Sequence, residues 1–418
     1  MERRSPARVL LDTVILGLFS GAFGLAYLWL VEKGTHALWG EVDSYRWFSG
    51  GWPSVVIPIT AGLITGALYR GLRVPPRFKG FIQDLEEGEV EPRTAPGALL
   101  IALVSLLGGA SLGPEAPLGT AGGAAGTWWA RRGGAGDDDV RTATFTGISA
   151  VFGGLLSTPL GGPLLAFELE HEQSNTYYTR HLVPGVIAGA IGFGLMWPVI
   201  GTPFVGLYDF DRVDFRPWMI LAGVGIGAGG ALVALLIGKA MTTTVGVMRR
   251  LDDRPVLRGL IAGCVVAVLA YAMPLTLFSG ASGLEPVLSK PANLGVALLL
   301  TLALLKTVAL AASLGGGFFG GPIFPTFFIG GTIGAAVHLI FPGLPLAITV
   351  GSTMAALGGA IALVPVSMAV LGTLIIQGGI LESSVVVVAA VTAFAVRSII
   401  APPPPRRGGE RNPLAEVA

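Results

Sequence analysis

Charged residues are scarce in this chain. Asp, Glu, Lys and Arg make up 13% of its 418 residues, whereas hydrophobic residues make up 52% and the mean hydropathy is +0.72. Soluble domains usually carry about 25% charged residues. This composition therefore excludes an ordinary soluble protein and indicates a chain that crosses a membrane many times. The net charge of +1 leaves no basic domain that could bind nucleic acid.

Cysteine, histidine and the usual enzyme motifs are also sparse. Cys264 is the only cysteine, which excludes an intrachain disulfide, and the four histidines show no metal-ligand spacing. Neither His-Glu-x-x-His nor Gly-x-Ser-x-Gly occurs. The run from Asp137 to Asp139 could suggest an intramembrane enzyme that binds a metal diphosphate, but no second acidic cluster accompanies it. We therefore predict no enzyme activity, no catalytic residue, no metal site and no cofactor.

Long apolar segments account for most of the sequence. Those long enough to span a bilayer, or nearly so, cover residues 9–31, 53–69, 96–112, 143–170, 182–200, 217–240, 257–278, 293–314, 326–341, 345–376 and 380–400. Arg and Lys gather at both termini and in residues 70–79, 131–141 and 249–258. The segments 34–52 and 201–216 are more acidic or mixed. By the positive-inside rule, we expect both termini to be cytoplasmic.

Two of these apolar regions are interrupted by glycine and proline. The first break, residues 111–123, contains a single acid, Glu115, and the second covers Gly315 to Pro325. An ionisable side chain at membrane depth is costly, so it marks a site for ions or protons by default. Paired interruptions at matching places in two halves of a membrane protein point to a binding site between the halves.

The two halves also resemble each other in sequence. The residues around Glu115 match those around Pro322, and the segment from Pro159 matches the segment from Pro365 at nearly the same offset. We expect a pseudo-symmetric repeat of tilted and broken helices, although the sequence does not reveal whether the repeat is inverted. The predicted parts are an N-terminus of residues 1–8, half-repeats of residues 9–200 and 201–400, and a polar tail of residues 401–418.

The breaks favour an anion over a cation. A helix that begins at a Gly-Pro break presents free N–H groups and the positive end of its dipole, and two such ends can hold an anion without a fixed cation. The charged carboxylate of Glu115 could occupy those N–H groups and leave them when protonated, since burial and the helix end act on it in opposite directions. A cation transporter would need more buried acids than Glu115 and Glu168.

At these residues the chain resembles the CLC family of chloride channels and proton/chloride antiporters, over about residues 8–400. The resemblance identifies Glu115 with the gating glutamate, and Gly321 to Pro325 with the element whose backbone faces the central anion. The segments Phe278–Gly283 and Thr158–Glu168, together with Lys306, fit other family elements. The anion-binding residues that the resemblance implies are Gly113, Pro114, Ala116, Gly321, Pro322, Ile323 and Phe324.

The resemblance also implies an all-α fold, a homodimer with a pathway in each subunit, and a place in the cell (inner) membrane. It predicts transport of a small anion, chloride by default, gated by protonation of Glu115. The chain looks like a divergent prokaryote-type member without cytoplasmic regulatory domains. Two alternatives to proton/chloride antiport are left by the resemblance. The protein could be an uncoupled anion channel, or it could transport another anion such as fluoride or nitrate.

Several family features are altered in this chain. Pro114 and Ala116 replace the basic residue and the glycine that flank the glutamate, and Ile323 stands where phenylalanine is usual. The serine motif of the central site is absent, its nearest counterpart being residues 75–81, and the late tyrosine is absent because Tyr271 is the last one. We therefore expect an inner gate that is looser or built differently.

The proton route on the inner side is also altered. A gapless alignment places Leu169 where proton-coupled family members carry an acid. Uncoupled channels of the family also lack an acid at this position. Glu168 or Glu170 could serve instead if the helix register shifts. We name these two acids as the candidates for an internal proton pathway, with a helix-end or solvated structural role as the alternative.

Overall fold

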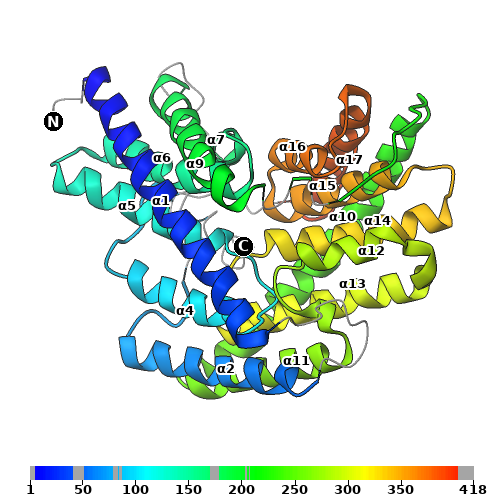
Figure 1. The fold of residues 1–418 in the computed structure, drawn as a ribbon, viewed down its shortest axis with the longest axis horizontal. Coiled ribbons are helices and arrows are strands. Elements are labelled where there is room, and N and C mark those ends of the chain that lie inside the picture. The colour runs from blue at the N-terminus through cyan, green and yellow to red at the C-terminus, as the bar shows by residue number, and fades with distance from the viewer. Residues whose placement is uncertain are drawn as a thin grey trace.

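The computed structural model describes residues 5–40, 51–78, 83, 87–169, 178–202, 205–206 and 208–402. These residues form helices and loops without a strand, as the composition predicts. Labelled as in Figure 1, the helices of the first half are α1 (Pro6–Trp39), α2 (Pro53–Leu72), α4 (Ala95–Leu107), α5 (Glu115–Arg132), α6 (Asp137–Leu155), α7 (Gly161–Leu169) and α9 (Val183–Ile200). Those of the second half are α10 (Met219–Met248), α11 (Pro255–Ala272), α12 (Glu285–Ser289), α13 (Pro291–Gly316), α14 (Ile323–Ile340), α15 (Leu346–Ala362), α16 (Pro365–Ile375) and α17 (Ile380–Ile400).

Eight of the described helices are long and apolar enough to cross a bilayer, namely α1, α2, α9, α10, α11, α13, α14 and α17. Two of the apolar segments are each divided into two helices. The segment 143–170 forms α6 and α7, and the segment 345–376 forms α15 and α16. Ser157 and Leu363 have positive φ at the two divisions, and a proline follows each one, so the helix cannot continue.

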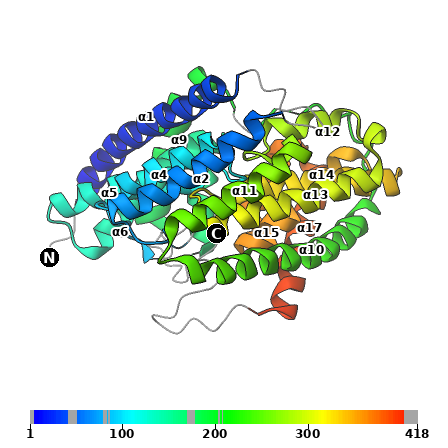
Figure 2. The same ribbon diagram turned by 90° about the horizontal axis from the view of Figure 1, so that it is seen from below.

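The two halves repeat the same order of helices. The series α1, α2, α4, α5, α6, α7, α9 is followed by α10, α11, α13, α14, α15, α16, α17. Figures 1 and 2 show the first series mainly on one side of the molecule and the second mainly on the other, with α2 and α11 side by side between them.

The equivalent helices α2 and α11 run antiparallel, so the repeat is inverted. Gly62 lies against the backbone of Gly259, and each would place an added Cβ on the other's carbonyl oxygen. Further along, Gly66 meets Pro255 and Gly263 meets Pro58, so the sequence numbers rise on one helix as they fall on the other. The sequence had left this point open.

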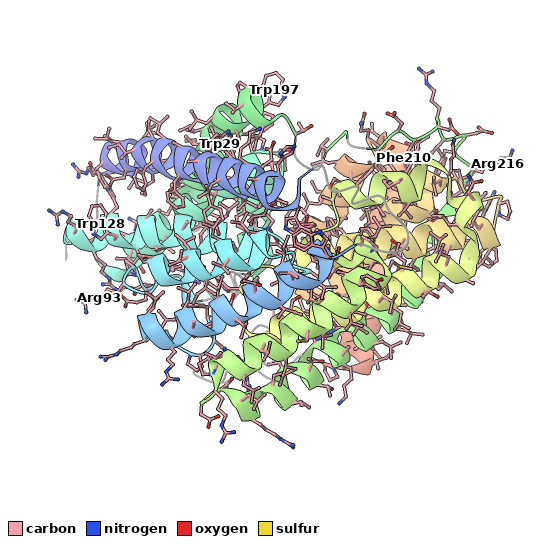
Figure 3. The ribbon with its side chains drawn as sticks, turned by 60° about the horizontal axis from the view of Figure 1, so that its bottom comes forward. Trp29, Arg93, Trp128, Trp197, Phe210 and Arg216 are labelled. Atoms are coloured by element: carbon pink, nitrogen blue, oxygen red, sulfur yellow. The ribbon has the colours of Figure 1, made fainter. Side chains whose placement is uncertain are left out.

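The interior of the molecule surrounds the second break. In α14, 72% of the most apolar stretch is buried inside the protein, compared with 33% in α1 and α17. Trp39 is buried in this interior, whereas Trp29, Trp128 and Trp197 are exposed, and Figure 3 shows these three at the outer surface. The guanidinium of Arg132 lies 5.6 Å from the ring centre of Trp128, an arrangement typical of a membrane-interface anchor.

Basic segments that are distant in sequence meet in pairs. The Trp129 indole at the end of α5 donates to Asp12 Oδ1 at the start of α1, at 3.0 Å. Arg77, which follows α2, forms an ion pair of 3.0 Å with Asp252, which precedes α11. The start of α1 and the end of α5 therefore share one side of the membrane, as do the ends of α2 and α11 that carry basic residues.

Candidate functional site

The two breaks lie against each other through their backbones. Gly113 N–H donates to Gly321 O, and Gly321 N–H donates to Gly113 O, both at 2.8 Å, in an antiparallel bridge. Glycine on both sides leaves room for Glu115, because a Cβ at either position would overlap its side chain as it lies here. The bridge places the starts of α5 and α14 next to each other in the middle of the protein.

Two serines fix the breaks from opposite sides. Ser105 Oγ on α4 accepts from Phe319 N–H of the second break at 3.0 Å. Ser313 Oγ on α13 accepts from Ser111 N–H of the first break at 3.1 Å. These two contacts occupy equivalent places in the inverted repeat. They satisfy buried backbone donors that no helix could satisfy.

The sequence pattern limits how many free donors each helix start offers. In α14 the third residue is Pro325, which has no N–H, and Thr326 N–H already bonds to Pro322 O at 3.0 Å. Only the N–H groups of Ile323 and Phe324 remain for a ligand. The start of α5 repeats this arrangement, with Pro117 in third place and Leu118 N–H bonded to Pro114 O at 3.1 Å.

The Glu115 side chain, from the first repeat, accepts hydrogen bonds from backbone N–H groups of the second repeat. Its side chain is fully buried, and Oε1 accepts from Ile323 N–H at 2.7 Å and from Phe324 N–H at 3.4 Å. Oε2 has no hydrogen-bond partner among the described residues. The carboxylate of the first repeat thus caps the central helix of the second one, and a carboxylate is itself an anion on a helix N-terminus.

The other predicted residues of the breaks also meet here. Pro114 and Pro322 directly precede α5 and α14, while Ala116, Gly321, Ile323 and Phe324 are buried. The geometry therefore brings the seven residues named from the resemblance to one place with Glu115. No cluster of acidic, histidine or cysteine side chains able to hold a metal occurs among the described residues.

Glu168 belongs to a different pair of helices. It lies near the end of α7, and its carboxylate accepts from Val366 N–H at 2.7 Å, Ser367 N–H at 2.6 Å and Ser367 Oγ at 2.5 Å. All three donors belong to the start of α16, the equivalent of α7 in the second repeat. Glu168 thus caps a helix across the repeat, as Glu115 does. Glu170 lies outside the described residues.

Two buried cations were not assigned a role by the sequence. Lys306 on α13 is fully buried and donates to the carbonyl oxygens of Leu277 and Phe278, both at 2.8 Å, and to Thr276 O at 3.2 Å. Arg258 on α11 is also fully buried. A lone Lys or Arg in an apolar segment signals such a role, but only the fold shows which carbonyls or acids it meets.

Comparisons with known proteins agree with this geometry. The protein YfeO of Salmonella paratyphi A, which is classed by name among ion-transport proteins, is 28% identical over 81% of this chain and 82% of its own length. YfeO of Salmonella typhimurium matches equally well.

Solved structures share the fold. A slow cyanobacterial chloride/proton antiporter superposes with a TM-score of 0.82 at 18% identity, covering 96% of both chains. A CLC-type fluoride/proton antiporter gives 0.79 at 18% identity, covering 95% of this chain and 98% of its own. The family model described as voltage gated chloride channel matches residues 61–398. The chain is therefore an integral membrane protein and belongs to the voltage gated chloride channel family.

Proposed function

We propose that this protein carries a small anion across the membrane in exchange for protons, along a path that passes between the starts of α5 and α14. The observation that carries the proposal is the hydrogen bond of 2.7 Å from Ile323 N–H to Glu115 Oε1. It places a protonatable group on the free donors of a central helix. A transported anion needs those same donors.

The exchange follows from competition for these donors. The charged carboxylate occupies the N–H groups of Ile323 and Phe324 and blocks the path. A proton removes its charge, so the side chain leaves, and the anion takes its place. No fixed cation is needed, since dipoles and N–H groups balance the charge, and the anion can leave again. The antiporters that share the fold, a chloride/proton antiporter and a fluoride/proton antiporter, support this assignment.

An uncoupled anion channel is the second candidate, and the contacts of Glu168 favour it. Its carboxylate already accepts from three donors at the start of α16. To relay a proton it would have to give up these hydrogen bonds, and position 169 holds leucine. In an antiporter, Glu168→Gln should reduce proton movement more than anion movement. In a channel, the variant should leave anion flux unchanged.

The test is anion efflux from liposomes that contain the purified protein, with external pH recorded at the same time, first with chloride and then with fluoride. Proton uptake that follows anion release and drives either ion uphill establishes the antiporter. Efflux without proton movement establishes the channel. The absence of efflux for both anions would contradict the proposal.

We also propose that the chain lies in the cell (inner) membrane with both termini cytoplasmic, and that it forms a homodimer with one path in each subunit. The membrane orientation is supported by the basic residues near the paired helix ends, α1 with α5 and α2 with α11. The dimer rests on the family resemblance, and a monomeric mass in mild detergent would contradict it.

A further inference from the structure

Three aromatic rings gather beside the Glu115 site on the side where α2 ends and α11 begins. Tyr69 comes from the last turn of α2, Phe78 from the segment after that helix, and Phe319 from the break before α14. The ring centres of Phe78 and Phe319 are 5.0 Å apart, and those of Tyr69 and Phe78 are 5.7 Å apart. Tyr69 and Phe319 are buried, and Phe78 is partly buried.

This aromatic cluster is continuous with the candidate site. Ala116, the residue after Glu115, packs in the same apolar cluster as Tyr69 and Phe319. Phe319 is also held by its backbone, because its N–H donates to Ser105 Oγ at 3.0 Å. The rings therefore lie next to the residue that follows Glu115, and Tyr69 and Phe78 come from chain segments that adjoin the basic residues of 70–78.

A buried arginine connects the segments that carry the rings. The guanidinium of Arg258 lies 5.1 Å from the ring centre of Tyr69. One of its NH2 groups donates to Asp252 Oδ1 at 2.5 Å and the other to Pro76 O at 2.8 Å, two residues before Phe78. The same Asp252 oxygen accepts from Arg77 at 3.0 Å.

Arg258 also contacts the segment that carries Phe319. Gly317, two residues before Phe319, has φ +89° and packs directly on the guanidinium, where a Cβ would lie 2.5 Å from the nearest nitrogen. One fully buried side chain thus contacts the segments of all three rings. Buried ion pairs of this kind can fix a particular arrangement even where they add little stability.

We propose that Tyr69, Phe78 and Phe319 form a hydrophobic inner gate to the Glu115 site, and that Arg258 is the residue that positions it. The inference rests on the proposed transport function. Apolar constrictions close a pathway because water and dehydrated ions are unstable in them. Phe78 lies in residues 75–78, the described part of the segment that stands in for the absent serine motif, so an aromatic ring takes the place of the serine hydroxyl expected there.

Phe78 is the ring most able to move. It comes from a loop segment, whereas Tyr69 sits on a helix and Phe319 is fixed by Ser105. Rotation or displacement of Phe78 would open the path from the basic face to Ala116 and Glu115. Arg77 and Arg258, with one aspartate between them, leave a net positive charge beside this entrance, which favours the approach of an anion.

The gate is tested by labelling, which does not require transport. In a background with Cys264→Ser, a cysteine introduced by Ala116→Cys is exposed to a small, charged thiol reagent from each side of the liposome. Adding Phe78→Ala should raise the labelling rate from the side of the basic segments by about tenfold, equivalent to about 1.4 kcal/mol of barrier. Phe193→Ala is the matched control, since this partly buried ring stacks on Trp197 in α9, far along the chain from the cluster. Equal labelling with and without Phe78 would overturn the gate.

Flux and a conservative variant complete the test. Phe78→Ala should raise anion efflux and, in an antiporter, lower the number of protons moved per anion. Tyr69→Phe keeps the ring and should behave as the parent protein. Arg258→Lys keeps the charge but loses the two-pronged contact, and should raise labelling while the protein still elutes as a folded species. If labelling responds but no anion moves, the gate stands and the transport proposal fails. If anion moves but neither variant changes labelling, the gate fails alone.

Discussion

At the scale of single residues, the candidate site is asymmetric within a symmetric frame. The bridge between Gly113 and Gly321 joins equivalent residues of the two repeats. The contacts of Ser105 and Ser313 are also equivalent in the two repeats. Glu115 has no acidic counterpart, because the first residue of the equivalent helix is Ile323. Only one of the two helix starts can therefore be capped by a carboxylate from the other. This difference gives the centre a single protonatable group, as a one-site exchange requires.

Replacing this carboxylate should separate the two transported species. Glu115→Gln cannot take up or release a proton, so it should abolish coupled proton movement while anion efflux continues and loses its dependence on pH. Simultaneous recording of anion efflux and pH in liposomes measures both effects. Glu89→Gln is the control, since this acid pairs with Arg131 at the surface, at 2.7 Å. Wild-type efflux that is already independent of pH would contradict a gating role for Glu115.

At the scale of elements, the sequence predicts the helices and breaks well, because both depend on local composition. Apolar length predicts the spans, and glycine and proline predict where α5 and α14 begin. The divisions between α6 and α7 and between α15 and α16 do not show in the apolar composition, which continues through both. Pro159 and Pro365, which follow the two divisions, stand out in the sequence as the starts of the matching segments.

Contacts between elements could not be predicted in the same way. The bond from Ile323 to Glu115 joins residues 208 positions apart, and the partner of a buried carboxylate is decided by which helices the fold brings together. The same holds for Glu168, whose contacts depend on α7 meeting the start of α16. The absent serine motif was recognised, but the rings beside it come from three separate segments.

The contact between α2 and α11 gives an element-scale prediction. Gly62 and Gly259 let the two backbones touch, so Gly62→Leu or Gly259→Leu should force the helices apart and lower the melting temperature in detergent. Overpacking of this kind typically costs about 1–3 kcal/mol. The equivalent positions of the two glycines imply similar losses. Gly71→Ala on the same helix faces open space and should leave the melting temperature nearly unchanged. Unaltered melting of both leucine variants would mean that the close contact is not needed.

At the scale of the whole molecule, inversion fixes how the two halves are oriented. Two equivalent helices of an inverted repeat start on opposite sides of the membrane. The first helix, α1, starts beside the basic end of α5, so α10 must start at the opposite face. The segment 201–216, which precedes α10, then faces outward if the basic face is cytoplasmic. The charge pattern alone gave the same orientation, and the inverted fold provides an independent reason for it.

Labelling of intact cells tests this orientation. In the Cys264→Ser background, Asp211→Cys places a thiol in the segment before α10, and Arg250→Cys places one in the basic segment after it. A membrane-impermeant thiol reagent should label position 211 in intact cells and position 250 only after the membrane is opened. Asp211 lies outside the eight membrane stretches and Arg250 is the second-last residue of one, and both side chains are exposed. Lack of access would therefore reflect sidedness rather than burial inside the protein. If position 250 alone is labelled in intact cells, the orientation is the reverse of the one proposed, and the inverted repeat is unaffected. If both positions are labelled, the placement of α10 across the bilayer is contradicted.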